Sequence, residues 1–177
     1  MEKRRVVITG MGVVAPNGIG IDNFWDSLVH GRSGIKAVQQ FEVSSYPSKI
    51  AGEVEEFDPK DYINHKNARR MDRFSQFGVV CSKMALLDSN IHLEQIEKDL
   101  IGVAVGSSVG GLPHAEEQHS IFLEKGLNRV YPLFSTRLFV GSCMNNICIE
   151  FGIKGPCYSL STGCATGADN IGFAFNM

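Results

Sequence analysis

The 177-residue sequence predicts an α/β fold, with a mainly parallel sheet and helices on both of its faces. Short apolar runs suited to buried strands alternate with segments whose apolar residues recur at helical spacing. The composition agrees, because 44% hydrophobic and 20% charged residues are typical of a globular domain with a sizeable core. A net charge of −2 provides no basic field, so we expect neither nucleic acid nor a membrane as partner.

The first half of the chain predicts one strand, two helices and a long irregular segment. Residues 5–9 form an apolar run that predicts a buried strand, followed by a glycine-rich turn. Asp22 is predicted to cap a helix that ends at Gly31, since Asp favours N-caps and Gly ends helices. Residues 33–61 contain prolines and glycines and predict an irregular excursion over the core. Apolar residues on one face predict a second helix over 72–88.

The second half alternates between predicted strands and helices. In chain order we expect a strand over 100–106, a loop over 107–113, a helix over 113–125, a long helix from a Ser135 cap to Gly152, a strand over 157–160 and a helix over 165–177. The last helix is still apolar where the sequence stops, so we expect a further segment or a second chain to complete the fold.

Cys164 lies between the last predicted strand and the last predicted helix, in the run Ser161-Thr-Gly-Cys-Ala-Thr-Gly-Ala-Asp169. Small residues on both sides predict a tight strand-to-helix turn. A helix N-terminus favours the thiolate, which is the nucleophilic form, and its backbone N–H groups can face an oxyanion. The alternative is a small buried core cysteine, and the local pattern leaves both interpretations open.

Two glycine-rich segments are predicted to be structural. Gly10-Met11-Gly12 follows a predicted strand, as in a dinucleotide-binding turn, but Pro16-Asn17-Gly18 would break the helix that such a site needs. We therefore favour a structural turn. Residues 102–111 lack the Gly-Lys-Ser/Thr ending of a phosphate-binding loop.

The five cysteines favour free thiols in a reducing compartment, because they form no CxxC pair and no Cys/His spacing of a zinc site. None of the five histidines lies in a motif that points to pairing with Cys164. The N-terminal apolar run is broken too early for a signal peptide, and no run reaches membrane-spanning length. We therefore expect a cytoplasmic protein with no metal and no cofactor.

Residues 65–73 form the one dense basic cluster of the sequence, His-Lys-Asn-Ala-Arg-Arg-Met-Asp-Arg. A solvated surface is the usual explanation for such a run, and composition alone favours it. The alternative is a docking patch for an acidic partner, since arginine side chains suit carboxylates and phosphates.

Five segments in collinear order resemble the β-ketoacyl-acyl carrier protein synthases, the condensing enzymes of fatty acid synthesis. They are residues 4–12, 69–74, 106–112, 155–159 and 161–167. The last of them matches the nucleophile motif of the family and is the most specific. The resemblance is closest to the type II elongating synthases and spans the whole chain.

This resemblance implies a thiolase-like layered fold, of which residues 1–177 would be the N-terminal half, with the C-terminal half absent. Cys164 would accept an acyl group from an acyl carrier protein, and its backbone N–H would help to stabilise the oxyanion. Malonyl carrier protein would then lose carbon dioxide, and the resulting carbanion would attack the acyl-cysteine in a Claisen condensation.

The resemblance also assigns binding residues. Val109 would line the acyl pocket near the cysteine, and Phe134 would reach across a dimer interface into the acyl pocket of the partner. Lys66, Arg69 and Arg70 match the basic contacts to the acidic carrier protein, which reverses the preference for a solvated surface. A homodimer, or a second chain that supplies the C-terminal half, is implied.

In this family two catalytic histidines, a phenylalanine gate and a structural lysine belong to the C-terminal half. The 177 residues alone are therefore expected to accept an acyl group without efficient condensation. Two alternatives stay open. One is a ketosynthase of a type II polyketide system, and the other is a non-catalytic half-subunit with a structural or carrier-binding role.

Overall fold

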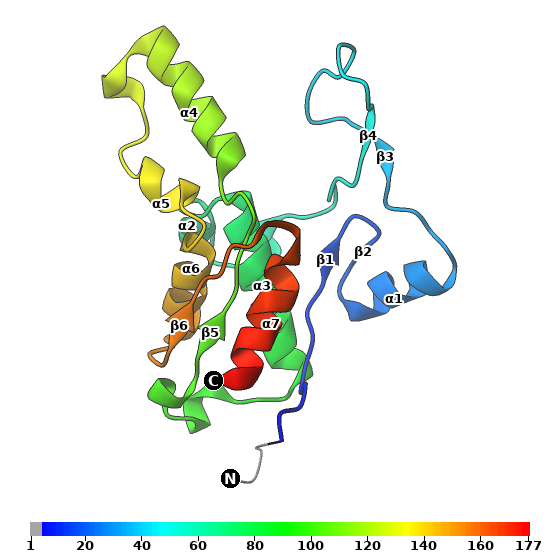
Figure 1. The fold of residues 1–177 in the computed structure, drawn as a ribbon, viewed down its shortest axis with the longest axis vertical. Helices are drawn as coiled ribbons and strands as arrows, with labels where there is room; N and C mark the ends of the chain where they lie inside the picture. The colour runs from blue at the N-terminus through cyan, green and yellow to red at the C-terminus, as the bar shows by residue number, and fades with distance from the viewer. Residues whose placement is uncertain (1–4) are drawn as a thin grey trace.

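The computed structural model describes residues 5–177, so the first family segment is described only from residue 5 (Figure 1). In chain order the helices and strands are β1 Val14–Ala15, β2 Gly18–Ile19, α1 Ile21–Val29, β3 Lys36–Ala37, β4 Ile50–Ala51, α2 His65–Ala68, α3 Arg73–Asp88, β5 Val103–Ala104, α4 Leu112–Lys125, α5 Phe134–Leu138, α6 Ser142–Phe151, β6 Cys157–Tyr158 and α7 Thr166–Asn176. Single 3₁₀ turns link several of these elements, and one of them, Gly163–Ala165, directly precedes α7.

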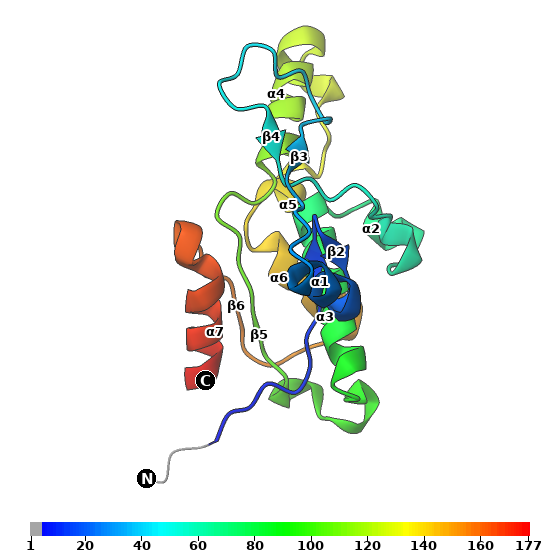
Figure 2. The ribbon, with the colours of Figure 1, turned by 90° about the vertical axis from the view of Figure 1, so that its right-hand side faces the viewer.

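The parallel pair β5–β6 lies between helices on both sides (Figure 2). Val103 pairs with Cys157 and Ala104 with Tyr158, and α7 covers one side while α6 and then α3 lie on the other. Helices therefore lie on both sides of this pair. The carboxyl end of β6 leads towards the Cys164 turn, so this layer positions the candidate site.

The core lies where α3 packs against α6 and the segment before α2. Val79 and Val80 on α3 are fully buried, and Ile147 on α6 is 3% exposed. The other members of the buried cluster are Phe57, Ile63, Ala68, Met71, Val103 and Cys143. Because α2 contributes Ala68 to this core, its short helix is anchored to the body of the protein.

Several sequence predictions are confirmed closely. Helix α3 begins after Asp72, whose carboxylate accepts a hydrogen bond from the backbone N–H of Phe74, and it ends at Asp88 with Ser89 as its C-cap. Helix α4 starts at Leu112, one residue before its prediction, and ends at Lys125. Gly152 ends α6 in the left-handed conformation, with φ of 66°.

The predicted helix from Ser135 to Gly152 is wrong, because the structure divides it into α5 and α6. Ser135 lies inside α5 and caps nothing, and the chain is extended at Phe139. The carbonyl of Leu138 accepts a hydrogen bond from the N–H of Gly111, which is remote in sequence. That tertiary bond replaces a helical one and stops the first segment. The cap of α1 is also corrected, from Asp22 to Gly20.

Residues 5–9 do not form the predicted buried strand, because no described strand pairs with them and Ile8 is 83% exposed. The following glycines are structural, but they serve close packing rather than a turn. A Cβ at Gly10 would lie 2.2 Å from the Ala85 carbonyl oxygen, and one at Gly12 would lie 2.0 Å from that of Cys81. The bare backbone therefore lies directly against α3.

The sheet is smaller and less parallel than predicted. Among residues 5–177 only β5 and β6 are parallel, while β1–β2 and β3–β4 are antiparallel pairs. The β3–β4 pair forms within residues 33–61, so the predicted irregular excursion carries a short sheet. None of the described helices combines the length and the apolar character needed to cross a bilayer.

Candidate active site

Cys164 lies on the 3₁₀ turn that leads into α7. Gly163, directly before it, has φ of 68°, which is a conformation that residues with a Cβ rarely adopt. The turn lifts Cys164 out of the packed layer, and its side chain is exposed. The alternative of a buried core cysteine is therefore wrong, and the predicted strand-to-helix placement is confirmed.

Local hydrogen bonds hold this turn in shape. The Thr166 side chain, which is 4% exposed, donates to the Gly163 carbonyl at 2.7 Å and accepts from the Thr162 N–H at 2.9 Å. The Thr162 hydroxyl in turn donates to the carboxylate of Asp169 on α7. The threonines of the motif therefore fix the loop that carries the cysteine.

Asn170 attaches the segment before the turn to α7. Its side-chain amide donates to the Leu160 carbonyl at 3.1 Å and to the Thr166 carbonyl at 2.7 Å, and its side-chain oxygen accepts from the Leu160 N–H at 3.4 Å. Asn170 is 4% exposed, so these bonds are shielded from water. Sequence reasoning missed Asn170, although an Asn inside a helix often marks a side chain that bonds backbone groups.

The loop after β5 lies directly against the same turn. Ser108 donates a hydrogen bond from its hydroxyl to the Gly163 carbonyl at 2.9 Å. A Cβ at Gly106 would lie 1.9 Å from the Leu160 carbonyl oxygen and 2.9 Å from the Asn170 side-chain nitrogen. This approach therefore requires glycine, and sequence reasoning identified neither role.

A pocket of about 440 Å³ opens beside Cys164. Four segments meet around it: the first half of α3, the loop after β5, the start of α6 and the Cys164 turn. Its lining comprises Phe74, Phe77, Gly78, Cys81, Val105, Gly106, Ser107, Ser108, Cys143, Gly163, Cys164, Thr166 and Gly167. Aromatic rings and thiols make much of this wall apolar, which suits a hydrocarbon chain next to the exposed sulfur.

Two further thiols in the pocket differ from Cys164 because they are shielded from water. Burial raises the pKa of the Cys81 thiol, and it raises that of Cys143 to about 12, with a smaller contribution from neighbouring Cys81. Both thiols therefore stay protonated near neutral pH and behave as small apolar groups. Cys164 is the exposed thiol of the three.

The lining of this pocket includes no histidine and no carboxylate. Within residues 5–177 no three His, Cys, Asp or Glu side chains are grouped so that they could hold a metal ion. The described part of the site can therefore offer a thiol nucleophile, backbone N–H groups and an apolar wall.

The two predicted acyl-pocket residues lie outside this lining. Val109 is 60% exposed and follows Ser108 directly in the loop after β5. Phe134 begins α5, and its ring packs against that of His114 with 5.9 Å between the centroids. The structure therefore places Val109 at the edge of the Cys164 site and Phe134 on a separate helix.

The predicted carrier-binding residues Lys66, Arg69 and Arg70 are all exposed. None of them takes part in an ion pair among the described residues. They lie on α2 and directly after it, four or more residues before Phe74 of the pocket. Three free cations are therefore presented next to the helix that lines the Cys164 pocket.

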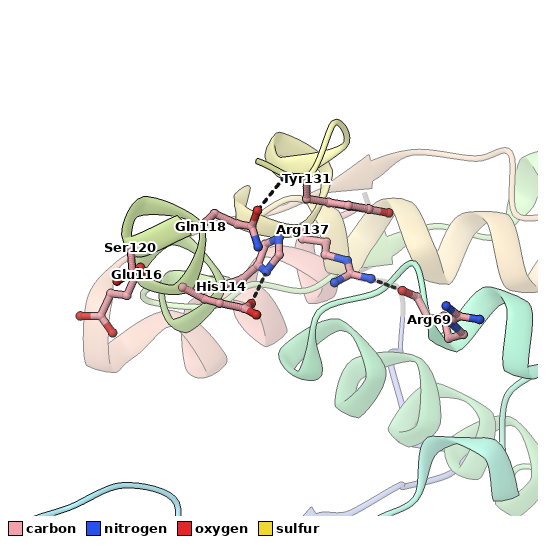
Figure 3. Close-up of polar contacts among 8 residues, drawn as sticks. Arg69, His114, Glu116, Gln118, Ser120, Tyr131 and Arg137 are labelled. Atoms are coloured by element: carbon pink, nitrogen blue, oxygen red, sulfur yellow. Dashed lines mark hydrogen bonds and ion pairs between the residues drawn. The ribbon is translucent and has the colours of Figure 1, made fainter. Parts of the chain in front are cut away.

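The backbone of this basic segment is held by other side chains. Arg137 of α5 points its guanidinium at the carbonyl of Arg69 and donates a hydrogen bond to it (Figure 3). The same guanidinium lies 4.7 Å from the centre of the Tyr131 ring, and the face of this ring attracts the positive charge of Arg137. On the other side Asn67 donates to Glu150 of α6 at 3.1 Å. The cations therefore project from a fixed scaffold.

Comparisons with known proteins identify the family of this chain. Residues 3–177 match the family described as beta-ketoacyl synthase, N-terminal domain, and the chain belongs to that family. The 3-oxoacyl-[acyl-carrier-protein] synthase 2 of Vibrio harveyi is 40% identical over all 177 residues, and these cover 43% of its length. The chain thus spans less than half of that relative.

Solved structures support the fold. A beta-ketoacyl synthase from Burkholderia phymatum superposes with a TM-score of 0.82 and 27% identity, over 96% of this chain and 42% of that one. A type II polyketide ketosynthase in complex with its acyl-carrier protein (AntDE:AntF) gives a TM-score of 0.81 at 24% identity, over 96% and 45%. The expected ketosynthase fold is confirmed.

Proposed function

We propose that this chain carries the acylation site of a β-ketoacyl-acyl carrier protein synthase of fatty acid elongation. The observation that supports this most is the exposed Cys164 thiol, which lies at the start of α7 beside a pocket lined by Phe74 and Phe77. The same position carries the family's nucleophile motif. The identity of 40% to a 3-oxoacyl-[acyl-carrier-protein] synthase 2 supports fatty acid elongation as the pathway.

In the proposed first step the Cys164 thiolate attacks the thioester carbonyl of an acyl carrier protein. The oxyanion that forms is stabilised by the Cys164 backbone N–H at the start of α7. When it collapses, the bond to the carrier sulfur breaks and the acyl group stays on Cys164. The apolar pocket receives the first part of the acyl chain, and Val109, directly after the lining residue Ser108, contacts the chain at the mouth of the pocket.

In the proposed second step malonyl carrier protein loses carbon dioxide, and its carbanion attacks the acyl-Cys164 carbonyl. The bond from that carbonyl to the Cys164 sulfur then breaks, which releases the β-ketoacyl carrier protein and restores the Cys164 thiolate. The described pocket contains no histidine to assist this step. We propose that the histidines come from a C-terminal half, in the same polypeptide or in a second chain. We also propose a homodimer in which Phe134 reaches the acyl pocket of its partner.

The carrier protein is proposed to dock on Lys66, Arg69 and Arg70. An acidic partner would gain attraction from three exposed cations without first breaking ion pairs of this chain. Charge reversal by Arg69→Glu with Arg70→Glu should weaken carrier binding at least about tenfold at low salt, and less at high salt. Lys49→Glu, at another exposed lysine, serves as the control. If both variants bound the carrier protein equally well, the basic cluster would be an ordinary solvated surface and not a docking site.

The two alternatives predict different results from one loading experiment. The protein is incubated with a saturated acyl carrier protein and, separately, with a polyketide-type carrier thioester, and its mass is then measured. Transfer from the saturated donor supports the fatty acid synthase, and transfer from the other donor alone supports a polyketide ketosynthase. Carrier binding without transfer to the protein would contradict the proposed activity and favour a non-catalytic partner. The carrier substrates also suggest a cytoplasmic location.

A further inference from the structure

A second pair of thiols lies outside the Cys164 pocket, where α6 meets β6. The sulfur atoms of Cys148 and Cys157 are 3.1 Å apart, and both side chains are half-buried. The Cys157 thiol also contacts the Gly155 carbonyl oxygen at 3.1 Å, in donor geometry. The Cys148 thiol can therefore donate to the Cys157 sulfur, which gives a chain of contacts from α6 to the loop before β6.

The backbone around this pair holds both cysteines in place. Gly152 ends α6 with φ of 66°, and the Ile153 N–H donates to the Cys148 carbonyl at 3.0 Å. The N–H groups of Lys154 and Gly155 both donate to the Lys98 carbonyl at 3.1 Å. Closing a disulfide of about 2.05 Å requires the sulfurs to approach by only about 1 Å, which side-chain rotation can supply.

We propose that Cys148 and Cys157 form a reversible oxidation site that a peroxide converts into an intramolecular disulfide. The Cys157 sulfur attacks the peroxide, the O–O bond breaks, and a sulfenic acid and one water or alcohol are produced. The Cys148 sulfur then attacks the sulfenic sulfur, and the S–O bond breaks with release of water. The two thiols lose two electrons and two protons in total, and an external dithiol reverses the reaction.

The environment of the Cys148 thiol favours its protonated form. Burial, and then the hydrogen bond to Cys157, raises the pKa of the Cys148 thiol to about 12, so near neutral pH this thiol can donate to the Cys157 sulfur at 3.1 Å. The resulting bond would tie the last turns of α6 to β6. That strand leads into the Cys164 turn, but Cys164 itself is not consumed. The proposal is therefore independent of the acylation chemistry.

The test is oxidation of the purified protein by a small excess of hydrogen peroxide, followed by alkylation and mass spectrometry. We expect a mass loss of about 2 Da before alkylation, and a fall from five alkylated thiols to three. Trypsin cuts after Arg137 and after Lys154, between the two cysteines, so the disulfide joins peptide 138–154 to the peptide that begins at Gly155. Dithiothreitol should restore all five thiols.

Those peptides also contain Cys143 and Cys164, so variants and fragment spectra must assign the bond. In Cys148→Ser the amount of disulfide-joined peptides should fall at least about tenfold. In Cys143→Ser, on the same helix, and in Cys164→Ser this amount should stay the same. Fragment spectra of the joined peptides from the oxidised wild-type protein identify the two bonded cysteines even if a variant fails to fold. Full alkylation of Cys148 and Cys157 after oxidation, or a bond through Cys164, would overturn the proposal.

Discussion

Replacing Gly106 with alanine would force a methyl group into the contact between the loop after β5 and the Cys164 turn. The new Cβ would lie 1.9 Å from the Leu160 carbonyl oxygen, 2.8 Å from the Thr166 methyl and 2.9 Å from the Asn170 nitrogen. To reach an ordinary contact of about 3.4 Å, the backbone must move by about 1.5 Å. The Leu160 backbone cannot yield without straining the Asn170 hydrogen bonds, and the loop after β5 cannot retreat without straining the bond from Ser108 to the Gly163 carbonyl.

Overpacking of this kind, together with one weakened buried hydrogen bond, should lower the free energy of unfolding by about 3 kcal/mol. Displacement of the turn by about 1 Å should also slow the acylation of Cys164 by a carrier thioester by about tenfold or more. Urea unfolding measures the first effect, and timed acyl transfer followed by mass spectrometry measures the second.

Gly172→Ala on α7 is the matched control, because a Cβ there meets nothing within 4 Å. Alanine in that helix should raise the free energy of unfolding by about 0.5–1 kcal/mol. If Gly106→Ala were as stable and as reactive as the wild type, the close contact between the two loops would be refuted.

Three further predictions follow from individual contacts. Asn170→Ala should lower the free energy of unfolding by about 2 kcal/mol, because it removes buried hydrogen bonds. The control Asn176→Ala removes a single exposed hydrogen bond on the same helix and should lower it by under about 0.5 kcal/mol. Equal losses in the two variants would contradict the role of Asn170. Arg137→Ala removes the hydrogen bond to the Arg69 carbonyl but leaves the cations Lys66, Arg69 and Arg70 in the sequence. It should weaken carrier-protein binding about threefold in titrations. Unchanged affinity would contradict the proposed role of Arg137 in holding this segment. The Cys143 pKa is raised from 9.0 to about 12, so the folded state keeps a proton that the unfolded chain loses. This stabilisation is complete below pH 9.0 and is lost towards pH 12, at up to about 1.4 kcal/mol per pH unit. In urea unfolding, the free energy of unfolding of Cys143→Ala should therefore fall less steeply with pH over this range than that of the wild type. Equal slopes for the two proteins would contradict the raised pKa.

Features set by local sequence were predicted well. Asp72 and Ser89 bound α3 because capping is decided by a few neighbouring residues. Gly152 ends α6 for the same kind of reason, since the left-handed conformation favours glycine. The small residues around Cys164 predicted its turn before α7, but they left open whether the side chain is exposed or buried, and the structure shows that it is exposed.

Features that depend on distant contacts were missed. The break between α5 and α6 arises because Gly111 bonds the Leu138 carbonyl, and no local pattern encodes that bond. Ser108 and Gly106 support the cysteine turn from a loop more than fifty residues earlier in the sequence, as the 55-residue separation of Ser108 and Gly163 shows. Residues 5–9 look like a strand locally, but a strand also needs a hydrogen-bonded neighbour, and none of the described strands provides one.

The most direct measurement is the rate at which each of the five thiols reacts with limiting iodoacetamide at neutral pH, resolved by peptide mass spectrometry. Cys164 should be alkylated at least about tenfold faster than Cys81 and Cys143, which burial keeps protonated within the same pocket. Prior incubation with an acyl carrier protein thioester should protect Cys164 alone. If Cys164 reacted no faster than Cys143, or gained no protection, the sulfur at the start of α7 would not be the nucleophile.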